Sequence, residues 1–450
     1  MPRSLGLRPQ AVAGSGEIPR VSLWHNLVYN TAHVLPAYLR GLFTPNRFWT
    51  GVWDRLQPDP AAVKFVSRLR RKYHSDYLYL RVMTKQTLLV LDPEGIRHVL
   101  DHSPEIYADA KLKRKGMAHF QPQAVTISRG PVWHDRRRFN EAVLDSDRAL
   151  HRYAETFLGI IGDEVSKGVQ SEQLVWDDVA RLFDGMTLQV IFGRGLHDAS
   201  SLKALRQMMK ESNRAFALKK SSVFDAFYVN LRHRRELAPE DSLAGLCRHA
   251  PVTSLTRPDG QIPHWLFAMA DTLAINSART LALIATFPKD EARVREEMAK
   301  ADLDTVEGVH ALAYLEGCIQ EAMRLWPTTP MLVRESVAPD RLGGVSLAPG
   351  TQVLILNSFN HRDRERVDGA DRFTPERWLQ RDRPDYRFNH LSNGAQVCAG
   401  KSLALFLSKA VLARLLAGYR FNLQRPPLDR RKPLPYLYNH FDLRLTIKAA

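Results

Sequence analysis

Hydrophobic residues recur at helical spacing through most of this 450-residue chain. From residue 150 to about residue 287 the pattern predicts helix almost throughout, with interruptions where glycine and proline gather, at 193–195, 238–239 and 258–260. The same spacing predicts further helices over 61–73, 131–144, 294–300 and 311–325. Because long helical stretches account for most of the chain, the pattern predicts a mainly α protein.

Short runs of β-forming residues lie towards the two ends. Residues 76–82 and 86–91 flank a short polar turn and predict a hairpin. A helix is predicted to begin directly afterwards at Asp92-Pro93, because proline fits well in a first turn. Nearer the C-terminus, proline and glycine turns separate two more β-prone runs, 331–333 and 351–356. These strands add a minor β portion to the predicted helical protein.

The stretch between Pro104 and Gly130 shows neither pattern. Long connections without secondary structure are uncommon and are often functional, so we expect an irregular functional loop here. Neither an internal repeat nor a linker rich in glycine, serine or proline divides the chain. We therefore predict a single large domain over residues 21–450, preceded by a flexible tail over residues 1–20.

The segment from Ile18 to Trp53 contains no acidic residue, and its apolar residues recur at roughly helical spacing. Two interpretations are open. Residues 21–50 either lie on an anionic membrane surface or form a helix packed on the body of the protein. Helix packing is the more common origin of such a stripe, and it is the structure we expect.

Composition narrows the class of protein. The chain has 64 Lys and Arg against 48 Asp and Glu, a net charge of +16 that favours acidic proteins, anionic membranes or nucleic acid as partners. No zinc-finger, RNA-binding or helix-turn-helix signature is present, so nucleic acid is not expected. The most apolar segment, 264–287, contains Asp271, Asn276 and Arg279 and therefore predicts a buried helix rather than a membrane span.

The three cysteines, Cys247, Cys318 and Cys398, are odd in number and far apart, which argues against disulfides or a zinc site and fits a reducing cytoplasm. Cys398 stands at the entry to an apolar helix, where free backbone N–H groups favour thiolate. Gly394 and Gly400 let the backbone pass close to a flat, bulky group. Such a cysteine suits a ligand of haem iron, although a buried structural cysteine remains the alternative.

Three further groups precede this loop in a fixed order. They are Trp133 with Arg137, Ala268 with Asp271 and Thr272, and Glu321 with Arg324 and the later Arg377. Any one pair is common on helices. Their order and spacing together with Cys398 resemble the cytochrome P450 family of haem-thiolate monooxygenases, in its bacterial-type soluble form. The resemblance extends from about Ala61 to the C-terminus.

The resemblance implies a single, mainly α domain with haem b as cofactor. Cys398 would be the axial ligand of the iron. Glu321, Arg324 and Arg377 would form a buried charged network beneath the haem. The residues implied to bind the cofactor are Trp133, Arg137, Arg334, His390, Gly394, Cys398 and Gly400. Among them, Trp133, Arg137 and Arg334 would donate to the haem propionates.

Asp271 and Thr272 match the acid–alcohol pair with which the family delivers protons during oxygen activation. The alternative is an ordinary polar face on a buried helix. The substrate is expected to lie above the haem. By family position, its pocket would be lined by Phe120, Val125, Ala268, Met331, Leu332, Val333 and Phe441.

The chain departs from the family pattern at three positions. Leu391 replaces the usual phenylalanine before the cysteine, and Gln396 replaces a basic residue that would pair with a propionate. Both changes are expected to tune the iron rather than to prevent its binding. Met269 replaces the usual glycine of the oxygen-activating helix, which predicts a smaller local distortion of that helix.

The resemblance implies a monooxygenase that oxidises an apolar organic molecule with dioxygen. Since the chain contains no flavin or iron–sulfur domain of its own, electrons are expected from a ferredoxin or flavodoxin with its reductase. Such an acidic protein would dock on Arg136, Arg138 and Lys401. A peroxide-driven haem enzyme and a non-catalytic haem sensor are the alternatives, and the substrate itself is not predicted.

Overall fold

The computed structural model describes residues 17–168, 171–214, 219–379 and 383–449. Most of the predicted tail, residues 1–16, therefore lies outside the described residues. The remaining residues of that tail run along a strand: Val21 donates to Tyr79 O (2.9 Å), Tyr79 donates to Pro19 O (3.0 Å), and Ile18 is buried.

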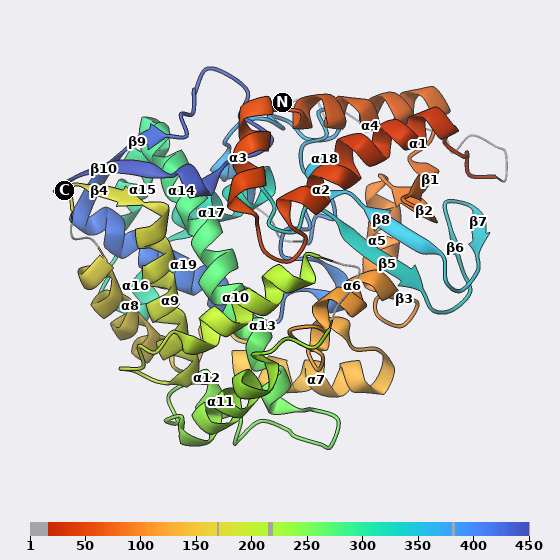
Figure 1. Cartoon of the computed structure of the whole chain (residues 1–450). Helices are drawn as coiled ribbons and strands as arrows, with labels where there is room; N and C mark the ends of the chain where they lie inside the picture. The colour runs from red at the N-terminus through yellow and green to blue at the C-terminus, as the bar shows by residue number, and fades with distance from the viewer. Residues whose placement is uncertain (1–16, 169–170, 215–218, 380–382, 450) are drawn as a thin grey trace.

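Five strands form the main sheet, on the right in Figure 1. In spatial order they are β1 (Tyr77–Val82), β2 (Lys85–Val90), β8 (Gln352–Ile355), β5 (Leu332–Ser336) and β3 (Tyr107–Asp109). Only β2 and β8 pair in parallel. A three-stranded sheet has the order β4 (Gln173–Val175), β10 (Arg444–Ala449), β9 (Tyr419–Arg425), and β6 (Asp340–Leu342) pairs with β7 (Val345–Leu347).

Helices at the N-terminal end lie beside and above the main sheet (Figure 1). They are α1 (Leu23–Tyr29), the π-helical η1 (Asn30–Val34), α2 (Leu35–Arg40), α3 (Arg47–Leu56), α4 (Asp59–Tyr73) and α5 (Pro93–Asp101). The predicted hairpin and the helix that follows it are present. The Asp92 side chain caps α5 by accepting from Gly95 N–H (2.8 Å).

The helical body fills the rest of the molecule. Its first half contains α6 (Lys111–Met117), η2 (Val125–Ile127), α7 (Gly130–Leu144), α8 (Ala154–Gly168), α9 (Trp176–Phe192), α10 (Ser200–Ser212), α11 (Phe224–Leu237), α12 (Leu243–Leu246) and η3 (Pro258–Gly260). A long central helix follows, made of α13 (Ile262–Phe267), the π-helical η4 (Ala268–Leu273) and α14 (Ala274–Thr286). Its central position explains why residues 264–287 are so apolar.

The later helices are shorter, apart from one. They are α15 (Pro288–Met298), α16 (Val306–His310), α17 (Ala313–Leu325), α18 (Asn357–Asn360), η5 (Pro375–Trp378), η6 (Gly394–Gln396), α19 (Lys401–Gly418) and η7 (His440–Asp442). The helix after Cys398, α19, is buried on most of its faces, which requires apolar residues all round rather than a stripe. It packs against α8 and α17 in the main core.

The prediction of a mainly α protein with a minor β portion is confirmed. The stretch between Pro104 and Gly130 was wrongly expected to be irregular, because it contains β3, α6 and η2. Strand β3 has three residues, all buried, and pairs with β5 more than two hundred residues away (Tyr107 with Ser336). Local patterning cannot reveal so short a strand, because its partner is distant in the sequence.

Candidate functional site

Cys398 lies in the turn between η6 and α19. Its N–H donates to Leu391 O (3.0 Å), and Lys401 N–H donates to Cys398 O (3.2 Å). Gly394 begins η6 with a φ of +67°, and a β-carbon there would lie 2.2 Å from Leu100 O of α5. Because only glycine fits so close to another backbone, Gly394 sets how the loop approaches α5 and hence where the cysteine stands.

The Cys398 side chain is exposed, whereas most residues of the loop around it are half-buried. Burial raises the pKa of the thiol, while Gly400 N–H, Arg137 and Lys401 lower it by less. The helix entry therefore acts in the expected direction but does not by itself favour thiolate. A metal ion at the sulfur would do so. Gly400 has an ordinary φ of −94°.

Trp133 and Arg137 on α7 lie next to this turn. The guanidinium of Arg137 donates to Val397 O (2.6 Å), directly before the cysteine, and to Glu141 (2.6 Å). It also lies 6.0 Å from the centre of the buried Trp133 ring. The structure thus places Arg137 against the residue before Cys398 and the Trp133 ring against Arg137.

Arg334 is buried on β5 and pairs with Asp109 of β3 at 3.0 Å. Asp109 also pairs with Lys113 at 2.6 Å. Burial would raise the pKa of Asp109, but Lys113 and Arg334 together hold it below its usual value. Two buried donors in this group, Arg334 Nε and Arg129 Nε, have no hydrogen-bond partner among the described residues.

The central helix is distorted where it carries the acid–alcohol pair. Residues 268–273 form the π-helical turn η4, so the helix is distorted here although Met269 stands where the family usually has glycine. A π turn inserts one extra residue into the helix, and this does not require glycine. Within η4, Met269 and Ala270 are buried, whereas Ala268, Asp271 and Thr272 are partly accessible. The turn η4 also contacts α19, the helix that follows Cys398.

Asp271 is held by an arginine that sequence reasoning missed. Arg206 of α10 donates to Asp271 Oδ1 through Nε (2.9 Å) and Nη2 (2.6 Å), and to both oxygens of Asp184 (2.7 and 2.6 Å). Burial raises the pKa of Asp271 and Asp184 adds to this effect, while Arg206 opposes it. Because the group joins three separate helices, sequence spacing carries no signal for it.

Glu321 and Arg324 form a fully buried ion pair on α17. Arg324 donates to both Glu321 oxygens (2.8 Å each) and to the carbonyls of His361, Ala370 and Arg372 (2.8–3.0 Å). Arg377 (3.2 Å) and Trp378 (2.9 Å) also donate to Glu321. The structure therefore brings the three predicted network residues together and adds Trp378.

His361 connects this network to the cysteine loop. Burial and the charge of Arg324 lower its pKa to about 3, so the ring is neutral. Asn389 N–H donates to Nε2 (2.8 Å), which leaves the proton on Nδ1 to donate to Arg324 O (3.2 Å). The His390 ring lies edge-on to Trp378 (5.1 Å) and to His361 (6.0 Å). His361 was not predicted, since nothing in its local sequence distinguishes it.

The predicted pocket residues are spread over several environments. Phe120 is buried and its ring lies 5.9 Å from Phe43 and 6.2 Å from Phe267, which precedes Ala268. Val125 N–H donates to Gln261 (2.9 Å) near the start of the central helix. These residues bring the loop between α6 and η2 to the accessible helix face.

Strand β5 presents its residues alternately. Leu332 and Arg334 are buried on one face, whereas Met331 and Val333 pack with the cluster under the N-terminal helices. Phe441 lies farther away, against Trp176 (5.8 Å) and Arg47 (5.9 Å). The structure therefore does not bring all the predicted pocket residues into one lining.

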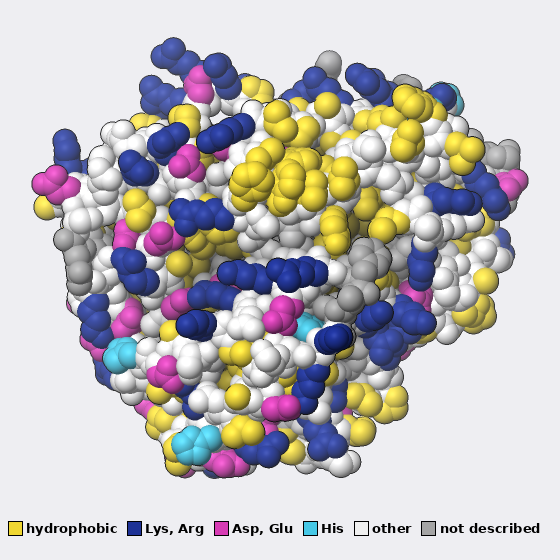
Figure 2. All heavy atoms as spheres, viewed as in Figure 1, with side chains coloured by type: hydrophobic (Ala, Val, Ile, Leu, Met, Phe, Trp, Pro, Cys, Tyr) yellow, Lys and Arg dark blue, Asp and Glu magenta, His cyan; other side chains and the backbone are white. Residues whose placement is uncertain are grey.

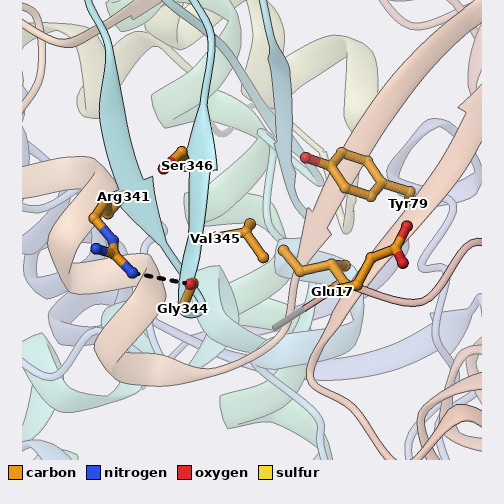
Figure 3. Close-up of a pocket in the computed structure, with 7 residues that line it drawn as sticks. Glu17, Tyr79, Arg341, Gly344, Val345 and Ser346 are labelled. Atoms are coloured by element: carbon orange, nitrogen blue, oxygen red, sulfur yellow. Dashed lines mark hydrogen bonds between the residues drawn. The ribbon is translucent and has the colours of Figure 1, made fainter. Parts of the chain in front are cut away.

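A separate surface hollow lies between β1 and the β6–β7 hairpin (Figure 3). Glu17 and Tyr79 line one side, and Arg341, which donates to Gly344 O at 3.4 Å, lines the other. None of the predicted site residues lines it.

The residues around Cys398 fit an iron porphyrin. The thiol is accessible, the helix face with Ala268 and Thr272 is open, and buried arginine donors without partners suit a propionate carboxylate. Buried donors are nearly always satisfied in a complete protein, so Arg334 Nε and Arg129 Nε indicate a bound group. Gln396 Oε1 is also buried without a partner.

The chain is similar in fold and in sequence to known proteins. A solved structure of a cyanobacterial protein, CYP120A1 with bound retinoic acid, superposes with a TM-score of 0.70 and 18% identity, over 86% of this chain and 94% of that one. Cyclooctat-9-en-7-ol 5-monooxygenase of Streptomyces melanosporofaciens is 22% identical over 77% of this chain and 83% of its own length.

Other relatives match in part. Cytochrome P450 4c3 of Drosophila melanogaster is 26% identical over 47% of this chain, and the match spans only 40% of that protein. The family model described as cytochrome P450 matches residues 44–238 and 259–438. Together with the buried Glu321–Arg324 network and the accessible Cys398, this match identifies the family. The chain belongs to the cytochrome P450 family of haem-binding monooxygenases.

Proposed function

We propose that this chain activates dioxygen at a haem and oxidises an apolar organic small molecule with electrons from separate redox proteins. The observation that carries the proposal is the accessible Cys398 near an open helix face that bears Asp271 and Thr272. Cys398 would hold the iron, and Arg334 with Arg137 and Trp133 would hold the propionates. A bound haem supplies the reductive activation of dioxygen.

Asp271 has the properties of a proton donor. Both bonds from Arg206 go to Oδ1, so no described residue hydrogen-bonds Oδ2, which is available to carry a proton. Burial raises the pKa of the carboxyl and makes protonation easier. The Thr272 hydroxyl, on the same accessible face, would position the water that receives this proton.

Carbon monoxide spectroscopy tests the proposal. The reduced protein with carbon monoxide should show the red-shifted Soret band of thiolate ligation, and Cys398→Ser should abolish it. Turnover with a ferredoxin system but not with hydrogen peroxide distinguishes the monooxygenase from a peroxide-driven enzyme. A wild-type spectrum without the shifted band, or turnover with neither system, would contradict the proposal.

We infer that the electron donor is an acidic ferredoxin or flavodoxin that docks near Cys398. Arg136 is less suited than expected, because it donates to Leu255 O (3.1 Å) and to Ser128 (2.8 Å). Arg138 has a side chain that is 59% exposed, and Lys401 is exposed beside the cysteine. These two cations support an electrostatic docking surface.

We also propose that α1–α3 lie on an anionic membrane surface. Large apolar side chains are exposed there and gather in a patch on the face shown in Figure 2. They are Leu23, Trp24, Leu27, Leu35, Leu42, Phe48 and Leu56, each at least 48% exposed. Single exposed apolar residues are common, but a contiguous group marks an interaction surface.

The surrounding charge favours a lipid headgroup region. No acidic residue occurs between Ile18 and Trp53, and Arg47 and Arg55 are exposed within or next to this segment. No helix among the described residues is long and apolar enough to cross a membrane. A peripheral contact from the cytoplasmic side fits these features and the three free cysteines.

A further inference from the structure

Arg279 of α14 differs from the other buried arginines of the described chain. Arg70, Arg324, Arg334 and Arg362 are also buried, and each has a carboxylate within 3.0 Å. Arg279 is 8% exposed and forms an ion pair with none of the described residues. An isolated buried charge is costly unless something compensates it, so the position calls for a partner.

Most hydrogen-bond donors of Arg279 have no acceptor among the described residues. Nη1 donates to Trp326 O at 2.5 Å, and this is its only hydrogen bond to a described residue. Nε is completely buried without a partner. Burial lowers the pKa of Arg279 to about 9, which reflects the missing counter-charge. The guanidinium thus has donors without an acceptor among the described residues.

Two more buried polar side chains, Tyr438 and His440, have atoms without a described partner and interact electrostatically with Arg279. Trp326 holds Arg279 through its carbonyl, and its ring lies 4.9 Å from the Tyr438 ring in a tilted arrangement. His440 N–H donates to Tyr438 O (3.1 Å), and η7 contacts α14. The Tyr438 hydroxyl and both ring nitrogens of His440 are buried without partners. Tyr438 and His440 are each no more than 2% exposed.

The charged groups near Arg279 leave its charge uncompensated. Arg279 and Arg47 lower the pKa of His440 after burial itself, so the field at that ring is positive. Burial raises the pKa of Tyr438; Asp54 and Asp442 raise it further, whereas Arg279 lowers it. Asp442 is already paired with Arg425 (3.4 Å), and neither Asp442 nor Asp54 forms an ion pair with Arg279. Neither carboxylate neutralises Arg279.

We propose that Arg279, Tyr438 and His440 form a buried binding site for a carboxylate group. Guanidinium and hydroxyl donors match carboxylate oxygens, and a bound anion would compensate the only unpaired buried arginine of the described chain. Arg279 follows Thr272 by seven residues on the same helix, two turns along one face. The carboxylate can therefore belong to the substrate of the proposed monooxygenase, on which that assignment rests, or to a free small acid.

Binding measurements on the haem-loaded full chain test the site. Formate and acetate serve as free carboxylates, chloride at equal ionic strength is the reference, and decanoate is compared with its methyl ester. The readouts are the thermal unfolding midpoint and the haem spin state. Saturable stabilisation by formate or acetate would indicate a free acid. Preference for decanoate over its ester by about tenfold or more would indicate a substrate carboxylate.

Single-residue variants show which side chains bind the carboxylate. Tyr438→Phe removes only the hydroxyl and should weaken carboxylate binding several-fold, and Arg279→Leu should abolish it. Tyr314→Phe removes a hydroxyl from α17 that bonds to Asp290 (2.7 Å), so it should lower stability without changing carboxylate binding. The proposal is overturned if no carboxylate stabilises the protein beyond chloride, or if Tyr438→Phe and Tyr314→Phe bind alike. The Cys398 spectrum reports separately on the monooxygenase proposal.

Discussion

Glu321 accepts hydrogen bonds from Arg324, Arg377, Trp378 and Thr374 N–H, all within 3.2 Å. Glu321→Gln keeps the volume but leaves the fully buried Arg324 without its counter-charge. We expect a loss of roughly 3–5 kcal/mol in unfolding free energy, measured by urea denaturation. Glu296→Gln at an exposed position of α15 should leave stability nearly unchanged. A loss of the same size in both variants would contradict the role of Glu321.

Arg206 is expected to set the pH at which Asp271 carries its proton. Arg206 lowers the pKa of Asp271 against the effect of burial, so Arg206→Gln should raise that pKa further. The Asp271-dependent step in the pH profile of oxygen consumption should therefore move to higher pH. The free energy of unfolding should also depend on pH through Asp271. Because the folded pKa of this carboxyl is raised above the unfolded one, the stability that it contributes is present below the unfolded pKa and is lost as pH rises through the folded pKa.

Asp271→Asn provides the control for this pH effect. It removes the titrating carboxyl and should slow oxygen consumption by about 100-fold or more, since proton transfer contributes on that order. The Arg206→Gln shift should then be absent from the Asp271→Asn background. If the shift persists in the double variant, another group titrates and the assignment to Asp271 is wrong.

Among the elements, the turn η6 places the cysteine through a single glycine. At Gly394 the φ of +67° and the contact with Leu100 O leave no room for a side chain. Gly394→Ala should cost about 1–3 kcal/mol in unfolding free energy and reduce the haem content of the purified protein. Gly418→Ala at the end of α19 meets no atom within 4 Å and should leave both unchanged or slightly raised. Equal haem contents would count against the packing argument.

The elements also show how far the sequence reveals the fold. Helices such as α7, α9 and α17 were predicted because each keeps an apolar face over three or more turns, and the hairpin β1–β2 because its strands are adjacent. Strands β3 and β4 were not predicted, since three residues carry no period and their partners are distant. The π turn at η4 depends on helix contacts and is invisible in the pattern.

The same limit applies to the site. Cys398, Glu321, Arg324 and Arg377 were found because their order along the chain matches a family. Arg206, Asp184 and His361 were not found, because they act only through contacts between separate helices and loops. The spacing of Gly394, Cys398 and Gly400 marks the loop, but what Gln396 changes at the haem stays a prediction.

For the whole molecule, the net charge of +16 should govern how the electron donor binds. Lys401→Glu and Arg138→Glu should each slow reduction by an acidic ferredoxin and weaken its salt dependence, because both charges lie on the proposed docking surface. Stopped-flow reduction at increasing ionic strength measures this. Lys432→Glu, whose only described partner is Asp429 at 3.7 Å, makes the same change elsewhere and should have little effect. Salt-independent reduction of the wild type would refute the docking surface.

The apolar patch over α1–α3 lies on the far side of the molecule from α11 in Figure 1, which provides an internal control for membrane binding. Trp24→Ser and Phe48→Ser replace side chains that are 68% and 69% exposed, and Leu237→Ser on α11 replaces one that is 70% exposed. Burying an aromatic side chain in the interface contributes about 1.5–3 kcal/mol, so each patch variant should lower vesicle affinity by about tenfold or more. Leu237→Ser should not.

Varying the lipid charge separates the electrostatic contribution to membrane binding from the apolar contribution. Vesicles with anionic phospholipid should bind the wild type more tightly than neutral ones, and added salt should remove that difference, because the headgroup attraction is screened beyond about 10 Å at 0.1 M. Trp24→Ser should weaken binding to both kinds of vesicle, since it removes apolar contact rather than charge. Sedimentation with vesicles measures each case. If Leu237→Ser lowered affinity as much as Trp24→Ser, the contact would not be specific to α1–α3, and the exposed residues there would have to serve a protein partner instead.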